Sequence, residues 1–478
     1  MRFAGKRVVA LAGLMMGATG AVQGQSAAAP KWEFQIVTLD PGHFHAALVQ
    51  KEMLPGVYPA THVFSPSPED TREFMRRIYA FNKRAENPTH WEVTSSIGDD
   101  YLERAMHVLE HPFQIVLGEG LFKVPLTVPV IVVISGNNSR KAEYIERSVQ
   151  AGFHVLADKP MIIRPEELPR LQKAFDEAPR KHVLLYDIMT ERFEITTILQ
   201  RELSRRKELF GVLQTGTTDD PAISKISVHN FSKVVSGAQL VRPQWFFDPE
   251  QQGAGIVDVM THLVDLVQWE AFPDVALEPA DAKVSSARRW TTPITLEQFG
   301  RVTGAQEFPG FLAPYVKDGV LHAPSNGEMN YTLKGIHART SVTWEFEAPP
   351  GAGDTHYSVM RGTRGVLTIR QGAEQGYKPV LYVERDGAVP ASKFEKALAA
   401  AVAEIAKTWP GIGVAPEGDR FVVAIPEKYH VGHEAHFTQV TQNFLGYLRA
   451  GKLPAWEVPN MLTKYATIMQ AYQKSAEK

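Results

Sequence analysis

The segment Val130–Met161 constrains the fold of this chain more than any other part of the sequence. It begins with the apolar run VIVVI, continues with a polar turn and an amphipathic run of helical period, and returns to a second apolar run before Asp158-Lys159-Pro160. A short apolar run bounded by turn residues is typical of a buried strand. Strands that alternate with helices in this way predict a parallel sheet, because each parallel connection needs a crossover.

Strand and helix candidates alternate throughout residues 31–187. After residue 187 the pattern changes to short, strand-like runs with helices between only some of them. We therefore predict an α/β chain with two domains. The first is a doubly wound parallel sheet of the Rossmann type over residues 31–187. The second is an α+β domain with a large antiparallel sheet over residues 188–478, which ends in helices within residues 437–474.

The first 28 residues are predicted to be a signal peptide. Three of the first seven residues are basic, and Val8–Val22 is apolar but too short and too rich in small residues to span a membrane. Cleavage is expected after Gly24 or after Ala28. We therefore expect a secreted or periplasmic protein without a membrane anchor.

Charge balance and cysteine content exclude several classes of function. The 51 basic and 53 acidic residues give a formal net charge of −2, which favours neither nucleic acid nor an anionic membrane surface. The sequence contains no cysteine, so disulfides, thiolate metal sites and a cysteine nucleophile are all excluded. These exclusions leave a small molecule as the expected partner.

The stretch that ends in Asp158-Lys159-Pro160 resembles the corresponding segment of the Gfo/Idh/MocA family of nicotinamide-dependent sugar oxidoreductases, in which the ending is Glu-Lys-Pro. A second stretch, Gly253–Asp265, resembles the glycine-rich loop of that family and its D-x-x-x-H-x-x-D helix. Apolar residues there recur at helical intervals, which places Asp258, His262 and Asp265 together on the opposite face. The resemblance extends weakly over residues 33–270.

The resemblance implies that Lys159 and His262 flank the carbinol that reacts. One of them would take the hydroxyl proton while the hydride leaves for the nicotinamide, and Lys159 would also contact the cofactor. Histidine titrates near neutrality, so we expect His262 to be the principal base and Lys159 to polarise the oxygen, although the two could exchange roles. Asp258 would orient the imidazole or bind a substrate hydroxyl.

The turn after the first strand stands where the family has a glycine-rich turn for the pyrophosphate. Only the middle glycine is present, at Gly42, because Asp40 replaces the first glycine and His45 the last. His43 and His45 could instead donate hydrogen bonds to the phosphates.

Two further positions bear on the cofactor. Ser65, after the second strand, stands where NAD-binding sheets often carry an acid, and a serine tolerates a 2′-phosphate better than an acid does, so NAD and NADP both stay open. Asn138, preceded by Asn137, aligns with the family asparagine that lies beside the nicotinamide ribose. We therefore expect both asparagines to contact the cofactor.

Sugars are bound by stacked rings and bidentate polar groups, and a few residues near the motifs have these types. The substrate candidates are Tyr186, Arg242, Trp245 and Asp265. No metal site is assigned, although His43 and His45 could serve a metal-dependent enzyme. The histidines at 430, 433 and 436 also have a spacing that can bind a metal, but incidental histidines in a loop are the commoner case.

These observations predict a secreted oxidoreductase that acts on a secondary hydroxyl of a sugar, glycoside or polyol. The cofactor, NAD or NADP, should not dissociate, because free nicotinamide cofactor is not expected outside the cytoplasm. One alternative is a redox-assisted glycosidase or lyase with no net redox change. Another is a non-catalytic carbohydrate-binding protein on the same fold, which the altered turn at Asp40 and His45 favours. The family resemblance also implies a homo-oligomer.

Overall fold

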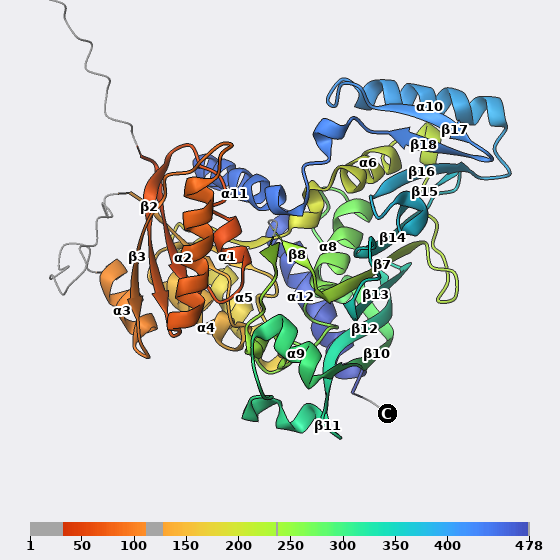
Figure 1. Cartoon of the computed structure of the whole chain (residues 1–478). Coiled ribbons are helices and arrows are strands. Elements are labelled where there is room, and N and C mark those ends of the chain that lie inside the picture. Colours follow the sequence, from red (N-terminus) through yellow and green to blue (C-terminus); the bar gives the residue numbers. More distant parts are fainter. Residues whose placement is uncertain (1–31, 111–127, 236–237, 477–478) are drawn as a thin grey trace, which may run out of the picture.

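The structure, a computed structural model, describes residues 32–110, 128–235 and 238–476 (Figure 1). The signal peptide predicted over residues 1–28 lies outside these residues. Among the helices of the described ranges, none is both long and apolar enough to cross a membrane.

Six parallel strands form the N-terminal sheet, in the order β3-β2-β1-β4-β5-β6. The strands are β1 (Phe34–Leu39), β2 (Val57–Ser65), β3 (Glu92–Ile97), β4 (Val130–Ile134), β5 (His154–Asp158) and β6 (Leu185–Ile188). The chain order reverses between β1 and β4, and ligands of doubly wound sheets bind at the carboxyl ends of the strands at such a reversal. The predicted doubly wound sheet is confirmed.

Two groups of helices flank this sheet (Figure 1). The first group holds α1 (His45–Leu48), α2 (Pro68–Lys83) and the C-terminal α11 (His433–Ala450), and the second holds α3 (Tyr101–Glu110), α4 (Lys141–Gln150) and α5 (Leu168–Glu177). Helix α2 begins where the sequence predicts it, because the Ser67 hydroxyl accepts a hydrogen bond from the Asp70 amide at 3.1 Å. Helix α1 has only four residues, and the chain turns away after it into β2.

A ten-stranded sheet dominates the rest of the chain, in the order β10-β12-β13-β7-β14-β15-β16-β18-β17, with β11 paired to β12. Only β13 and β7 pair in parallel, so the predicted large antiparallel sheet is confirmed. Its strands are β7 (Ile223–Ser232), β10 (Ala282–Thr295), β11 (Val316–Lys317), β12 (Val320–Leu333), β13 (Ile336–Glu347), β14 (Thr355–Arg361), β15 (Gly365–Gln371), β16 (Val380–Arg385), β17 (Gly413–Glu417) and β18 (Arg420–Ala424). A separate pair consists of β8 (Val234–Val235) and β9 (Ala238–Gln239).

Helix α8 (Met260–Ala271) is the central helix of this part, in contact with α12, α6, β13 and β7 (Figure 1). Every residue from Met260 to Gln268 is buried, so the helix has no solvent face. A polar side chain on such a helix must find a partner or face a cavity. The remaining helices are α6 (Ile195–Ser204), α7 (Lys207–Phe210), α9 (Leu296–Thr303), α10 (Ala391–Ile405) and α12 (Glu457–Lys474).

Candidate active site

A cavity of about 780 Å³ lies between the carboxyl end of the N-terminal sheet and the large sheet. One wall comes from the turn after β1 and from the end of β5, and another comes from β7 and β14. Helix α8 and the segment that leads into α11 complete the lining. A volume of this size accommodates a small organic molecule.

Lys159 and Asp258 form an ion pair in the wall of this cavity. The Lys159 ammonium, which follows β5, donates to Asp258 Oδ1 at 2.5 Å, and both side chains are more than nine-tenths buried. Burial raises the pKa of Asp258, but the charge and hydrogen bond of Lys159 outweigh burial and hold this pKa below its ordinary value. The carboxylate is therefore ionised and fixes the position of the amine.

His262 lies one helical turn beyond Asp258 and lines the same cavity. Burial, together with the positive charge of Lys159, lowers the pKa of His262 to about 3. Its Nδ1 atom is buried and has no hydrogen-bond partner among the residues that the structure describes. The imidazole is therefore neutral at physiological pH, with a ring nitrogen lone pair that can accept a hydrogen bond from a hydroxyl. Asp258 bonds the amine of Lys159, whereas the sequence left it either to orient the imidazole or to bind a substrate hydroxyl.

The carboxylate of Asp158 is the centre of a second cluster in this region. Its Oδ2 atom lies 2.9 Å from His45 Nδ1 and accepts a hydrogen bond from the Ser135 hydroxyl at 2.9 Å, while its Oδ1 accepts from the Lys159 backbone amide. His43 Nδ1 lies 3.7 Å from the same Oδ2. Burial opposes ionisation, yet the side chains of His45, Lys141 and His43 hold the pKa of Asp158 well below its ordinary value. Burial lowers the pKa of His45 to about 4. Both histidines thus contact a carboxylate of the protein.

The turn after β1 keeps its close packing despite the missing glycines. Asp40 is buried and adopts a left-handed backbone with a φ of 53°, which a glycine would adopt without strain. Burial and the charge of Asp70 raise the pKa of Asp40 to about 7. A Cβ atom on Gly136, in the turn after β4, would lie 2.0 Å from the Asp40 carbonyl oxygen, so only glycine fits there. A Cβ on Gly42 would lie 2.9 Å from Asp70 Oδ2 and 3.0 Å from the Trp245 ring.

The segment of residues 244–253 lies against the turn after β4. The Asn138 amide donates to the Gln251 carbonyl at 2.8 Å, and the Asn138 side chain donates to the Gln252 carbonyl at 2.8 Å. Asn137 Nδ2 donates to Gln251 Oε1 at 2.8 Å. The Oδ1 atom of Asn138 is buried without a hydrogen-bond partner in the described part of the chain.

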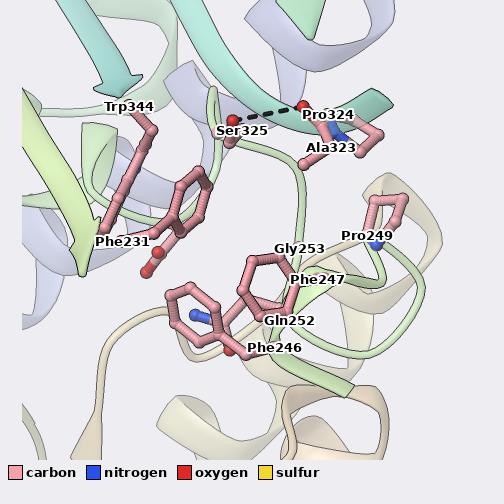
Figure 2. A pocket seen from close by; sticks show the side chains of 12 residues that line it. Phe231, Phe246, Phe247, Pro249, Gln252, Gly253, Ala323, Pro324, Ser325 and Trp344 are labelled. Carbon is pink, nitrogen blue, oxygen red and sulfur yellow. Dashed lines mark hydrogen bonds between the residues drawn. The ribbon is translucent and has the colours of Figure 1, made fainter. Parts of the chain in front are cut away.

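Aromatic rings connect this segment to the large sheet. Figure 2 shows the small pocket that Phe246 and Phe247 of the segment share with Phe231 of β7 and Trp344 of β13. The Arg242 guanidinium lies 4.4 Å from the Phe246 ring centroid and 5.2 Å from that of Trp344. Arg242 also lines the large cavity, and it forms no ion pair with any residue that the structure describes. Its Nε donates to the Phe231 carbonyl at 2.9 Å and its Nη2 donates to the Asn230 carbonyl at 3.3 Å, so two backbone oxygens hold the guanidinium in place.

Several predicted site residues do not line the large cavity. These are Gly42, Ser65, Asn137, Asn138, Tyr186, Trp245 and Asp265. The Ser65 hydroxyl donates to the Ser67 carbonyl at 3.1 Å, and the Trp245 ring lies beside Gly42. The Tyr186 hydroxyl donates to Glu457 at 3.2 Å.

Asp265 belongs to a buried network of charges rather than to the polar face expected with Asp258 and His262. Arg192 donates to both of its oxygens, at 2.6 and 2.7 Å, and Lys464 donates to it at 2.8 Å. Helix α8 begins only at Met260, so Asp258 precedes it, and Asp265 lies about 60° around the helix from His262, where Arg192 and Lys464 reach it. The partners lie far away in the sequence, so spacing alone did not reveal them.

The cavity also holds charged residues that the sequence pattern did not indicate. Glu191 Oε1 lies 3.2 Å from His433 Nδ1. Asp354 Oδ2 lies 3.0 Å from Lys233 Nζ and 3.3 Å from His229 Nδ1. His433 stood out only through its repeated spacing, and the others carried no sequence signal.

Comparison with known proteins agrees with this architecture. The family "Oxidoreductase family, NAD-binding Rossmann fold" matches residues 61–186, and the family "Putative oxidoreductase C terminal domain" matches residues 199–476. The crystal structure of a "putative oxidoreductase" from Parabacteroides merdae ATCC 43184 is 46% identical, with a TM-score of 0.86 over 94% of this chain and 98% of that chain. No curated protein matches the chain.

More distant solved structures share the fold alone. A 3-ketoreductase from Actinomadura kijaniata, in complex with NADP and TDP-benzene, has 14% identity and a TM-score of 0.51 over 92% of this chain and 96% of that chain. GenD2 from gentamicin A biosynthesis, in complex with NAD, has 13% identity and a TM-score of 0.53 over 94% and 96%.

Proposed function

The chain belongs to the Gfo/Idh/MocA family of oxidoreductases, and from this premise we propose that it oxidises a secondary hydroxyl of a sugar, glycoside or polyol. Its N-terminal sheet is an NAD-binding Rossmann fold. The observation that carries the proposal is the presence of Lys159, Asp258 and His262 on one cavity. These three residues supply a cation, its counter-ion and a neutral base.

Each of the three residues has a defined task in the proposed reaction. The ammonium of Lys159, fixed by Asp258, donates a hydrogen bond to the substrate oxygen and stabilises the charge that develops on it. The neutral imidazole of His262 accepts the hydroxyl proton. A bound nicotinamide would accept the hydride from the carbon. In this proposal His262 is the base and Lys159 polarises the oxygen, as the sequence favoured.

The residues at the switch point of the sheet fit a nicotinamide dinucleotide. Asn138 presents a buried oxygen without a partner within the described ranges, beside the turn where the ligand would lie. Gly42 has no side chain, which lets the Asp70 carboxylate and the Trp245 ring approach the turn after β1 closely. We assign the cofactor to Gly42, Ser65 and Asn138, with Asn137 holding the 244–253 segment against them.

Tight retention of the cofactor is part of the proposal. The 244–253 segment bonds to both asparagines, and Trp245 lies against Gly42, so a dinucleotide at this edge would be covered. The signal peptide predicted for residues 1–28 would deliver the protein to a compartment without free cofactor. Retention supports repeated turnover there.

The class of substrate rests on two kinds of support. The first support is analogy with proteins of the same fold. The 3-ketoreductase was solved with a TDP derivative, and GenD2 comes from the biosynthesis of gentamicin A. The cavity itself offers Trp344 and Phe246 as rings and Arg242 as a polar group. Rings of this kind stack on the apolar faces of sugars.

The test begins with the purified protein as isolated. It is denatured, and the released nicotinamide dinucleotide is quantified by mass spectrometry. The native protein is also incubated with a panel of glycosides and polyols, and keto-sugar is measured. We expect about one dinucleotide per chain and at least one substrate that yields a keto-sugar. Absence of both would refute the proposal.

A further inference from the structure

His43, His45 and Asp158 form a compact group of metal-ligating side chains. Each offers one ligand atom, and the three atoms all lie within 4.8 Å of one another. The side chains are largely buried, with exposed fractions of 12%, 8% and 4%. Two imidazoles and one carboxylate are a ligand set that divalent transition metals favour.

The local backbone explains why the group forms. His43 and His45 are two positions apart, at the start of the short helix α1, and their ring centroids lie 4.0 Å apart. Asp158 ends β5, two strands away in the sheet, and reaches the same point from the other side of the switch region. Residues 113 positions apart in the sequence thus converge.

The hydrogen bonds of Asp158 are satisfied without the second imidazole. Its carboxylate already accepts hydrogen bonds from the Ser135 hydroxyl and the Lys159 amide and contacts His45. His43 Nδ1 accepts a long hydrogen bond from the His45 backbone amide at 3.4 Å and lies 3.7 Å from the same carboxylate oxygen, which is too long for a hydrogen bond to it. Ligand atoms on one metal ion are spaced in this way, since each lies about 2.0–2.2 Å from the ion.

We propose that His43, His45 and Asp158 bind a divalent transition metal ion, such as Zn²⁺, in the wall of the large cavity. Both histidines line that cavity, and the Lys159 amide bonds Asp158 directly. Two histidines and one carboxylate leave coordination positions open, here for water or for the hydroxyl oxygens of a substrate. The two histidines are then metal ligands and not the phosphate contacts that the sequence suggested. This inference does not depend on the proposed function.

The test uses the full chain, stripped with a chelator and dialysed. Co²⁺ is added, and its visible absorption reports the number and strength of bound ions, while isothermal titration gives the affinity for Zn²⁺. The variants are His43→Ala, His45→Ala and Asp158→Asn. His430→Ala is the matched control, because His430 lines the same cavity outside the group. Circular dichroism verifies that each variant folds.

We expect one metal ion per wild-type chain and the same in His430→Ala. Each of the three ligand variants should weaken binding by on the order of 100-fold or more. If Asp158→Asn does not fold, the two histidine variants decide the question. Metal binding that is absent in the wild type, or equal in wild type and both histidine variants, would overturn the proposal.

Discussion

The ammonium of Lys159 lies 2.5 Å from Asp258 Oδ1, although the two residues are 99 positions apart. Lys159 comes from the end of β5, and Asp258 precedes α8, so the pair links the N-terminal sheet to the segment that leads into α8 at the cavity. A buried ion pair of this kind contributes more to position than to stability. It holds the amine beside the neutral imidazole of His262.

The energetics of this pair can be measured. Lys159→Met leaves Asp258 as a buried, unpaired carboxylate, which should lower the free energy of unfolding by about 3–5 kcal/mol. The double variant Lys159→Met with Asp258→Asn removes both charges and should recover most of that loss. Urea unfolding of the single and double variants gives the coupling. If the losses of unfolding free energy in the single variants simply add in the double variant, the result would contradict the pairing.

His262→Gln should remove catalysis without removing the fold. Transfer of a proton by a positioned side chain contributes about 10²–10⁴-fold to a rate, so kcat should fall within that range. The unfolding free energy should change little, because Nδ1 of His262 has no protein partner in the described structure. His436→Gln is the control, since His436 is another buried histidine on the cavity. Equal losses of kcat in both variants would count against a specific role.

Asp265→Ala should have the opposite effect to His262→Gln. The substitution leaves Arg192 and Lys464 without a shared counter-ion in a buried network, so the free energy of unfolding should fall by about 3–5 kcal/mol. Any variant protein that stays folded should keep its KM, because Asp265 does not line the cavity. A large rise in KM with unchanged stability would restore the substrate role expected from the sequence.

The pH dependence of the unfolding free energy should reveal the raised pKa of Asp40. Its pKa is about 7 in the folded protein against an ordinary 3.8, so between these values the folded state keeps a proton that the unfolded chain has lost. Its contribution to stability therefore falls as the pH rises from about 4 to about 7, by on the order of 4 kcal/mol.

Asp40→Asn removes this titration, and asparagine tolerates the left-handed backbone at this position. The variant should gain stability over the wild type as the pH rises, with most of the gain present at pH 8. Thermal unfolding at pH 5 and at pH 8 makes the comparison. If the variant were more stable than the wild type by the same amount at pH 5 and at pH 8, the gain in stability would have a cause other than the titration of Asp40.

Local pattern in the sequence was sufficient for both sheets and for the placement of Lys159 and His262. The apolar run Val130–Ile134 and the motif around Asp258 depend on neighbouring residues, and the structure has a strand and a buried helix there. Two candidates that do not line the cavity, Tyr186 and Asp265, bond to partners that are distant in the sequence. Asp265 meets Lys464, which is 199 positions away, and no local period encodes that contact.

The turn after β1 illustrates a second limit of sequence patterns. Asp40 and His45 replace two glycines of the family turn, yet the turn after β1 still packs closely against its neighbours. Asp40 adopts the left-handed conformation itself, and Gly136 of the neighbouring turn supplies the room. A glycine in one turn thus replaces a glycine in another, which can be recognised only when the two turns are seen together.

The central claim is that Lys159, Asp258 and His262 act on one carbinol while its hydride moves to a nicotinamide. The most direct measurement uses a substrate from the panel with deuterium on the reacting carbon. After a single turnover, the protein is denatured and the dinucleotide is analysed by mass spectrometry. We predict deuterium on the nicotinamide ring with the wild type and none with Lys159→Met. Keto-sugar formed by the wild type with an unlabelled dinucleotide would contradict the account.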